Sequence, residues 1–231
     1  MGFFNTLSLY TIRPQTEKVV SPVSSSYQQV ALYNNCEVIR GMMVMTGSFA
    51  ASIVRLFTLG DKKVNVVGTG FLVGTKYVVT CAHVIAQALN IDEETRERPS
   101  EKTVHLDFPK SSSQKRFTAH VICWYPPQPS FHLSVTSIKD IAILELDEIA
   151  PRDALATRFA APKTDDRSGH QFYTYGFPYG YNQSVSATGQ LRATELNGWM
   201  QLEVTTTTSI PIEPGFSGAP VWDKDDGGVV G

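Results

Sequence analysis

The sequence has few cysteines, no long apolar run and almost no net charge. Its three cysteines cannot all pair with one another, and none has a CxxC or other metal-ligand spacing, which argues against a disulfide scaffold and against a zinc site built from paired cysteines. No run reaches the roughly 18 apolar residues that a membrane-spanning helix needs. The formal net charge of −2 lacks the concentrated positive face of phosphate-backbone binders. These absences argue against a nucleic acid or a membrane as partner.

What remains is an ordinary globular chain. Hydrophobic residues make up 42% of the 231 residues and charged residues 18%, enough to bury the core of one large domain or two small ones. The opening, MGFFNTLSLY, fits the myristoylation template loosely at Gly2, but we favour an ordinary N-terminus. It has no basic region of the kind that begins a signal peptide. With Cys36, Cys81 and Cys123 interpreted as reduced thiols, the sequence predicts a cytoplasmic protein.

Short β-rich runs dominate the chain from residue 51 onward and predict an all-β fold. The first set comprises SIVRLFTL, NVVGTGFLVG, KYVVTCAHVI, TVHLDF, FTAHVICWY and DIAILELD. The second set comprises QFYTYGFPYG, SVSATGQLRATEL, WMQLEVTTTTSI, APVWD and GGVVG. Only AHVIAQALNIDEE has helical spacing, and it predicts one short helix that begins near His83.

The same pattern predicts four segments. Residues 1–47 form an N-terminal extension of unknown role, 48–150 a first β unit, 151–168 a charged connector and 169–231 a second β unit. Two β units with many short strands indicate paired barrels or a sandwich.

Three residues are candidates for nucleophilic catalysis, which needs a hydroxyl, a base and a carboxylate that orients the base. Ser217 lies in GFSG, where Gly215 and Gly218 permit a tight turn that aims the N–H groups of Gly215 and Ser217 at one point. His83 ends an apolar strand, and Asp140 precedes a buried one. Taken singly, each also has a plain structural interpretation: a turn serine, a core histidine and a strand-start aspartate.

Three windows, GTGFLVGTKYVVTCAHVI, KDIAILELD and PGFSGAPVWD, follow one another in the order His, Asp, Ser. Together they closely resemble the chymotrypsin-like (trypsin-like) serine peptidases, especially the bacterial and HtrA-type branch. The resemblance implies two six-stranded antiparallel β-barrels and a serine endopeptidase that acts on polypeptides without a cofactor. It makes His83 the general base, Asp140 its orienting partner and Ser217 the nucleophile. The N–H groups of Gly215 and Ser217 would bind the oxyanion.

The sequence departs from the family pattern at several positions, and each departure leads to a further expectation. Phe216 replaces the aspartate that pairs with a freshly cut N-terminus, so activation by that ion pair is not expected. In digestive relatives the residue six places before the serine lines the base of the specificity pocket. By this resemblance Pro211 would take that position with Glu213 nearby, which favours a small or aliphatic residue at the cut site. In the family, further residues follow the position of Gly231. Either the chain belongs to a longer protein with further domains, or its second barrel is incomplete and presents an open edge.

Other functional interpretations are weaker. GFSGA nearly fits the nucleophile elbow of α/β-hydrolases, but that fold needs a histidine after the serine and none follows Ser217. Four other histidines have no metal-ligand spacing, so we expect no metal site: His105, His120, His132 and His170. The remaining alternative to a peptidase is a catalytically inactive protease-fold module for binding or regulation.

Overall fold

The computed structural model describes residues 9–10, 49–59, 64–127, 140–161, 166–179, 181, 183–194, 199–204 and 211–231. Most of the predicted N-terminal extension lies outside these ranges, as do Gly2, Cys36 and His132. The boundaries predicted for the four segments stay predictions.

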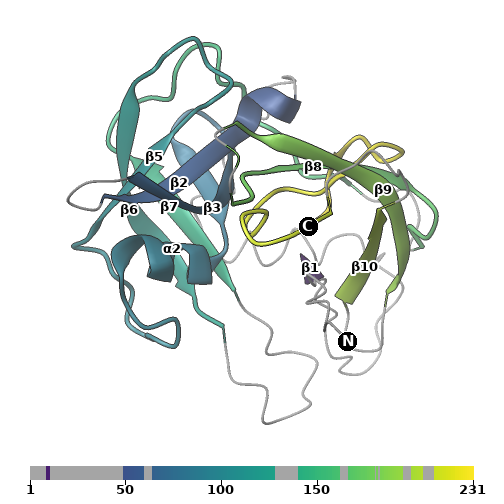
Figure 1. Cartoon of the computed structure of the whole chain (residues 1–231), viewed down its shortest axis with the longest axis horizontal. Coiled ribbons are helices and arrows are strands. Elements are labelled where there is room, and N and C mark those ends of the chain that lie inside the picture. Colours follow the sequence, from purple (N-terminus) through teal and green to yellow (C-terminus); the bar gives the residue numbers. More distant parts are fainter. Residues whose placement is uncertain are drawn as a thin grey trace, which may run out of the picture.

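The first β unit is a closed antiparallel barrel, on the left of Figure 1, with the strand order β2-β3-β4-β7-β6-β5. Its strands are β2 (Ile53–Leu59), β3 (Val64–Leu72), β4 (Tyr77–Thr80), β5 (Thr103–Asp107), β6 (Arg116–Tyr125) and β7 (Ile141–Leu146). Buried and more exposed residues alternate along most of β6, as expected for a strand with one face toward a core. Pairing of β2 with β5 closes the barrel and leaves it without a free edge.

Helix α2 (Ala82–Leu89) covers one end of the barrel. It buries Val84 and Ile85 completely, within the cluster that also contains Leu56, Leu106 and Leu144. The helix ends at Asn90, whose φ of 50° is the left-handed cap conformation that asparagine tolerates. The helix predicted near His83 is therefore confirmed. No helix within the described ranges has the length and apolar character needed to cross a bilayer.

The second β unit is a six-stranded antiparallel sheet, on the right of Figure 1, with the order β1-β10-β9-β8-β11-β12. It comprises β1 (Leu9–Tyr10), β8 (Gln171–Gly176), β9 (Val185–Thr194), β10 (Trp199–Val204), β11 (Trp222–Asp223) and β12 (Gly228–Val229). Over the described residues this sheet does not close. The all-β prediction is confirmed, with one closed barrel and one open sheet.

The edge of β12 is covered. The N–H of Val229 donates to the Arg158 carbonyl at 2.8 Å, and the N–H of Ala160 donates to the Val229 carbonyl at 2.9 Å. These bonds form a short parallel bridge between Phe159 and Val229. The connector after the barrel therefore satisfies backbone groups that an exposed edge strand would leave open.

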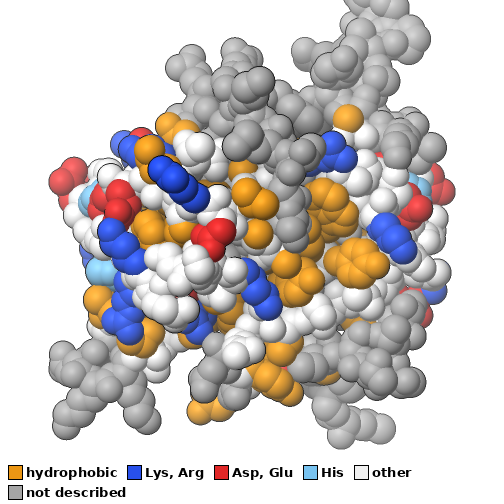
Figure 2. Space-filling view, turned by 90° about the horizontal axis from the view of Figure 1, so that it is seen from above, with side chains coloured by type: hydrophobic (Ala, Val, Ile, Leu, Met, Phe, Trp, Pro, Cys, Tyr) orange, Lys and Arg blue, Asp and Glu red, His pale blue; other side chains and the backbone are white. Residues whose placement is uncertain are grey.

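The two units share apolar contacts. Val229 is buried among Phe71, Val79 and Ile143, which lie on the outer side of the barrel strands. Figure 1 accordingly places the C-terminal segment between the barrel and the second sheet. From above, Figure 2 shows hydrophobic side chains gathered near the middle of the face, with charged side chains to either side.

The barrel core generates a first prediction. Leu106→Ala removes a fully buried side chain and should lower the free energy of unfolding by about 2–5 kcal/mol, because the cavity cannot fully collapse. Leu59→Ala in β2 is the matched control, since the Leu59 side chain is 51% exposed and should cost less than about 1 kcal/mol. Urea denaturation measures both values. Equal losses would contradict the burial pattern.

Candidate active site

His83 and Asp140 meet because β4 and β7 are neighbours. Thr80 at the end of β4 pairs with Ala142 of β7, His83 follows Thr80 by one turn, and Asp140 directly precedes β7. His83 Nδ1 lies 2.6 Å from Asp140 Oδ2, and the His83 backbone N–H donates to Asp140 Oδ1 at 2.9 Å. Both carboxylate oxygens are thus bonded to one residue, which fixes the orientation of the imidazole.

Burial and the nearby carboxylate shift the pKa of His83 in opposite directions. Burial alone would lower the pKa of His83, because it disfavours the charged ring. The hydrogen bond and the negative charge of Asp140 outweigh burial, and the pKa of His83 ends above its ordinary value of 6.5. The Asp140 side chain is only 6% exposed and that of His83 is 23% exposed, so the pair is shielded while the ring remains accessible.

The segment around Ser217 consists of two successive turns. The N–H of Phe216 donates to the Glu213 carbonyl at 3.1 Å, and the N–H of Ala219 donates to the Phe216 carbonyl at 2.8 Å. Gly215 and Gly218 have φ values of +108° and +78°, which favour glycine. In the described part of the chain, the N–H groups of Gly215 and Ser217 donate to no acceptor. Among the described residues, nothing therefore competes with an anion for these two donors.

Thr69 holds this turn segment against β3. Its N–H donates to the Ser217 carbonyl at 2.8 Å, and its hydroxyl donates to the Gly215 carbonyl at 2.8 Å. The Gly215 carbonyl also accepts the Phe177 N–H at 3.0 Å. Sequence reasoning did not single out Thr69, although GTGFLVG contains it. A Cβ at Gly68 would lie 3.0 Å from the Ser217 carbonyl oxygen, so the glycine permits the close approach.

Cys81 lies between the His–Asp pair and the turn segment. Its Sγ, a ring nitrogen of His83 and a carboxylate oxygen of Asp140 all lie within 4.8 Å of one another. Burial, followed by the negative charge of Asp140, raises the pKa of the Cys81 thiol well above its usual range, while the Gly218 N–H acts on the sulfur in the opposite sense. The backbone next to Ser217 is therefore adjacent to the pair, but no hydrogen bond joins the described side chains of His83 and Ser217.

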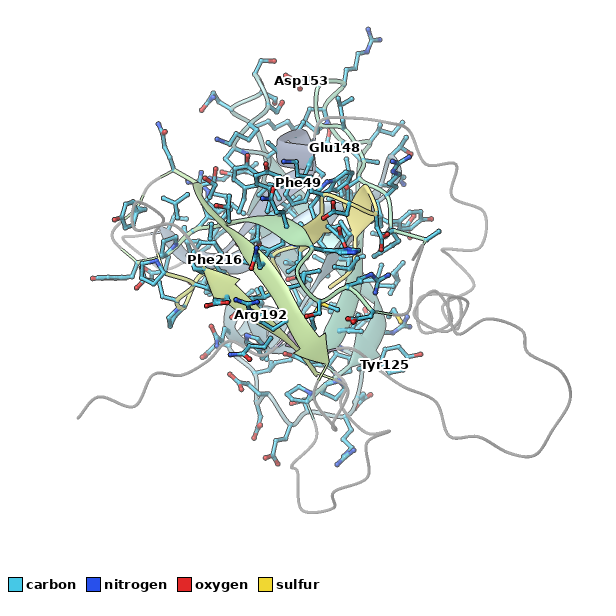
Figure 3. All side chains as sticks on the ribbon, turned by 90° about the vertical axis from the view of Figure 1, so that its right-hand side faces the viewer. Phe49, Tyr125, Glu148, Asp153, Arg192 and Phe216 are labelled. Carbon is cyan, nitrogen blue, oxygen red and sulfur yellow. The ribbon has the colours of Figure 1, made fainter. Side chains whose placement is uncertain are left out.

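The predicted pocket residues flank the same turns. Pro211 is exposed, and Glu213 is half-buried with its carbonyl bonded to Phe216. Phe216 is 4% exposed, and its ring lies 2.4 Å from the position of a Cβ at Gly176. Figure 3 labels Phe216 beside the strands of the second sheet. Phe216 is thus buried against Gly176, and any larger residue at position 176 would collide with the Phe216 ring.

The turn geometry generates a second prediction. Gly218→Ala and Gly169→Ala both place a Cβ at positive φ (+78° and +87°), at a cost of about 1–2 kcal/mol each. Only the Cβ at Gly218 collides, at 2.1 Å from the Thr69 carbonyl oxygen, whereas nothing lies within 4 Å at Gly169. Gly218→Ala should therefore lose clearly more unfolding free energy than Gly169→Ala in denaturant titrations. Equal losses would mean that the segment does not pack on β3.

The His83–Asp140 pair generates a third prediction. NMR titration should give His83 a pKa above 6.5, and Asp140→Asn should move that pKa below 6.5, because burial remains while the carboxylate charge is lost. A raised histidine pKa contributes stability that is complete below pH 6.5 and disappears as the pH rises through the folded pKa. Asp140→Asn should therefore destabilise the protein more at pH 6 than at pH 8. An unchanged His83 pKa in this variant would contradict the assigned cause.

Comparisons with known proteins agree with the observed fold. Residues 68–231 match the trypsin-like peptidase domain, and no curated protein matches the sequence. The crystal structure of the serine endoprotease from Yersinia pestis has a TM-score of 0.50 at 14% identity, over 80% of this chain and 56% of that one. The HtrA-type protease AlgW with tripeptide has a TM-score of 0.51 at 19% identity, over 80% and 53%.

These two structures show a shared fold, and the chain spans a little over half of their length. The domain match is the stronger finding, since it covers well over half of the chain and includes His83, Asp140 and Ser217. The chain belongs to the trypsin-like peptidase family.

Proposed function

We propose that this chain is a serine endopeptidase that hydrolyses peptide bonds through an acyl-enzyme intermediate. His83 is the general base and acid, Asp140 its orienting partner, and Ser217 the nucleophile. The observation that carries the proposal is the 2.6 Å contact between His83 Nδ1 and Asp140 Oδ2 beside the segment that contains Ser217. A histidine held in this way has the tautomer that a serine nucleophile requires.

The chemistry follows from the proton on His83. Because the Asp140 carboxylate accepts the Nδ1 proton, Nε2 presents a lone pair that can take the proton of the Ser217 hydroxyl. The serine oxygen then adds to the scissile carbonyl carbon. The tetrahedral intermediate collapses when His83 gives its proton to the departing amine, which leaves the acyl-enzyme. Water, deprotonated by His83 in turn, releases the acid and restores Ser217.

The N–H groups of Gly215 and Ser217 bind the oxyanion in this proposal. Both lack an acceptor within the described residues, and the Gly215 carbonyl is fixed by Thr69 and Phe177. Donors fixed before the reaction stabilise the developing charge without reorganisation, and each contributes about 3–4 kcal/mol in related mutagenesis.

The hydroxyl of Ser217 and the ring of His83 are not hydrogen-bonded to each other. Catalytic hydrogen bonds are often long without substrate and tighten when it binds. The substrate is a polypeptide, and with Pro211 at the pocket we propose a small or aliphatic residue at the cut site. A cytoplasmic location belongs to the same proposal, because a reducing compartment keeps thiols such as Cys81 reduced.

A fluorophosphonate probe tests the proposed nucleophile. The folded full chain should label at Ser217, as located by mass spectrometry, and Ser217→Ala should abolish labelling at that position. His83→Ala should slow labelling by at least about 10³-fold, because the base is lost. Ser186→Ala, an exposed serine in β9, is the matched control and should label like the wild type.

Folded wild-type protein that stays unlabelled would contradict the proposal and favour an inactive binding or regulatory module. Circular dichroism of every variant excludes unfolding as the cause of a lost signal. Labelling at a serine other than Ser217 would also contradict the assignment.

A further inference from the structure

Three side chains at the candidate active site have the chemistry of a zinc site. The Cys81 Sγ, a His83 ring nitrogen and an Asp140 carboxylate oxygen lie within 4.8 Å of one another. Thiolate, imidazole and carboxylate are the ligands that Zn²⁺ takes in proteins, at about 2.0–2.3 Å. We propose that Cys81, His83 and Asp140 bind Zn²⁺ and that the bound ion inhibits the enzyme. Only the inhibition rests on the proposed peptidase function.

The fold brings the three ligands together from fixed elements. Cys81 is the extended N-cap residue of α2 (φ −76°, ψ 144°), and His83 follows two residues later in the first helical turn. The β4–β7 register places Asp140 opposite. The His83 side chain is 23% exposed, so solvent reaches the ring and a water molecule can complete a tetrahedral set.

The charges of the site favour a divalent cation. Two anionic ligands, the Cys81 thiolate and the Asp140 carboxylate, neutralise the two charges of Zn²⁺, which lowers the cost of burial. Zn²⁺ between the sulfur and the carboxylate would offset the repulsion between the two anions.

Another cluster does not meet these conditions. His170, Asp223 and Asp225 also lie within 4.8 Å of one another. There the Arg167 guanidinium lies 3.8 Å from Asp223 and supplies positive charge in place of a metal. That group includes no sulfur. Charge and ligand chemistry together single out the Cys81 cluster.

Binding rearranges protons without oxidation or reduction. The S–H bond of Cys81 breaks, its proton goes to solvent, and sulfur donates an electron pair to Zn²⁺. Metal at Nδ1 displaces the proton shared with Asp140, which passes through solvent to Nε2 and leaves a neutral ring. The Nδ1 to Oδ2 separation of 2.6 Å must then open by about 0.7 Å, to the spacing of two ligands on one ion.

Inhibition follows from the tautomer. With its proton on Nε2, the His83 ring has no lone pair directed at Ser217 and cannot accept the hydroxyl proton. Zinc therefore stops the proposed reaction by holding the His83 ring in the unreactive tautomer. This effect requires the sulfur of Cys81, because the His–Asp pair alone supplies only two ligands.

Cobalt provides a direct measurement of the ligand set. Co²⁺ takes tetrahedral zinc sites, and coordination by a thiolate gives an intense near-ultraviolet charge-transfer band. The full chain and Ser217→Ala should both show this band, so the measurement is independent of catalysis. Cys81→Ser should lose it. Cys123→Ala is the matched control, because Cys123 is buried in another cluster, and it should keep the band.

Zinc competition and labelling complete the test. Loss of an outer-shell partner alone costs about 10- to 100-fold in metal affinity, so Cys81→Ser should weaken Zn²⁺ binding by at least about 100-fold. Zinc should slow fluorophosphonate labelling of the wild type at Ser217, and a chelator should restore the labelling rate. Labelling of folded Cys81→Ser should not respond to the same zinc concentration. A cobalt band without any labelling would retain the metal site and refute the peptidase proposal. Absence of the band in wild type, or its persistence in folded Cys81→Ser, would overturn the zinc site.

Discussion

The hydrogen bond from the Thr69 N–H to the Ser217 carbonyl joins the barrel to the segment that carries the proposed nucleophile. The hydroxyl of the same threonine binds the Gly215 carbonyl, and both bonds measure 2.8 Å. Thr69 is completely buried, and Thr80 bonds its carbonyl from the next strand. A hydrogen bond of this kind contributes only about 1 kcal/mol to stability. Its larger effect is positional, since it sets where Ser217 lies relative to the end of β4.

Much of the architecture could be predicted because its signals are local. The strand runs, the short helix and the three windows around His83, Asp140 and Ser217 each lie within a few consecutive residues. The contacts of Thr69 with Gly215 and Ser217 could not be derived in this way, because they join residues nearly 150 positions apart. The same holds for β1, whose two residues pair with β10 near the other end of the chain.

A histidine–aspartate contact does not identify a catalytic site by itself. His170 Nδ1 lies 2.8 Å from Asp223 Oδ2, much like His83 and Asp140. The surroundings differ: Asp223 is completely buried and lies near Arg167, whereas the His83 pair adjoins Cys81, which lies beside Gly218 of the Ser217 segment. The sequence already distinguished the two pairs, because both His83 and Asp140 lie in windows that resemble a known family, whereas His170 lies in none of them.

The division of the site between barrel and sheet has a consequence during protein synthesis. Ribosomes release a polypeptide from its N-terminus, so the barrel with His83 and Asp140 emerges before the loop of Ser217 exists. Docking of that loop also requires β3, already folded, to receive it, and Val229 packs against the barrel later still. If His83, Asp140 and Ser217 have the proposed roles, a nascent chain would hold His83 and Asp140 together before Ser217 is in place, and the proposed cleavage could begin only after the second unit has docked.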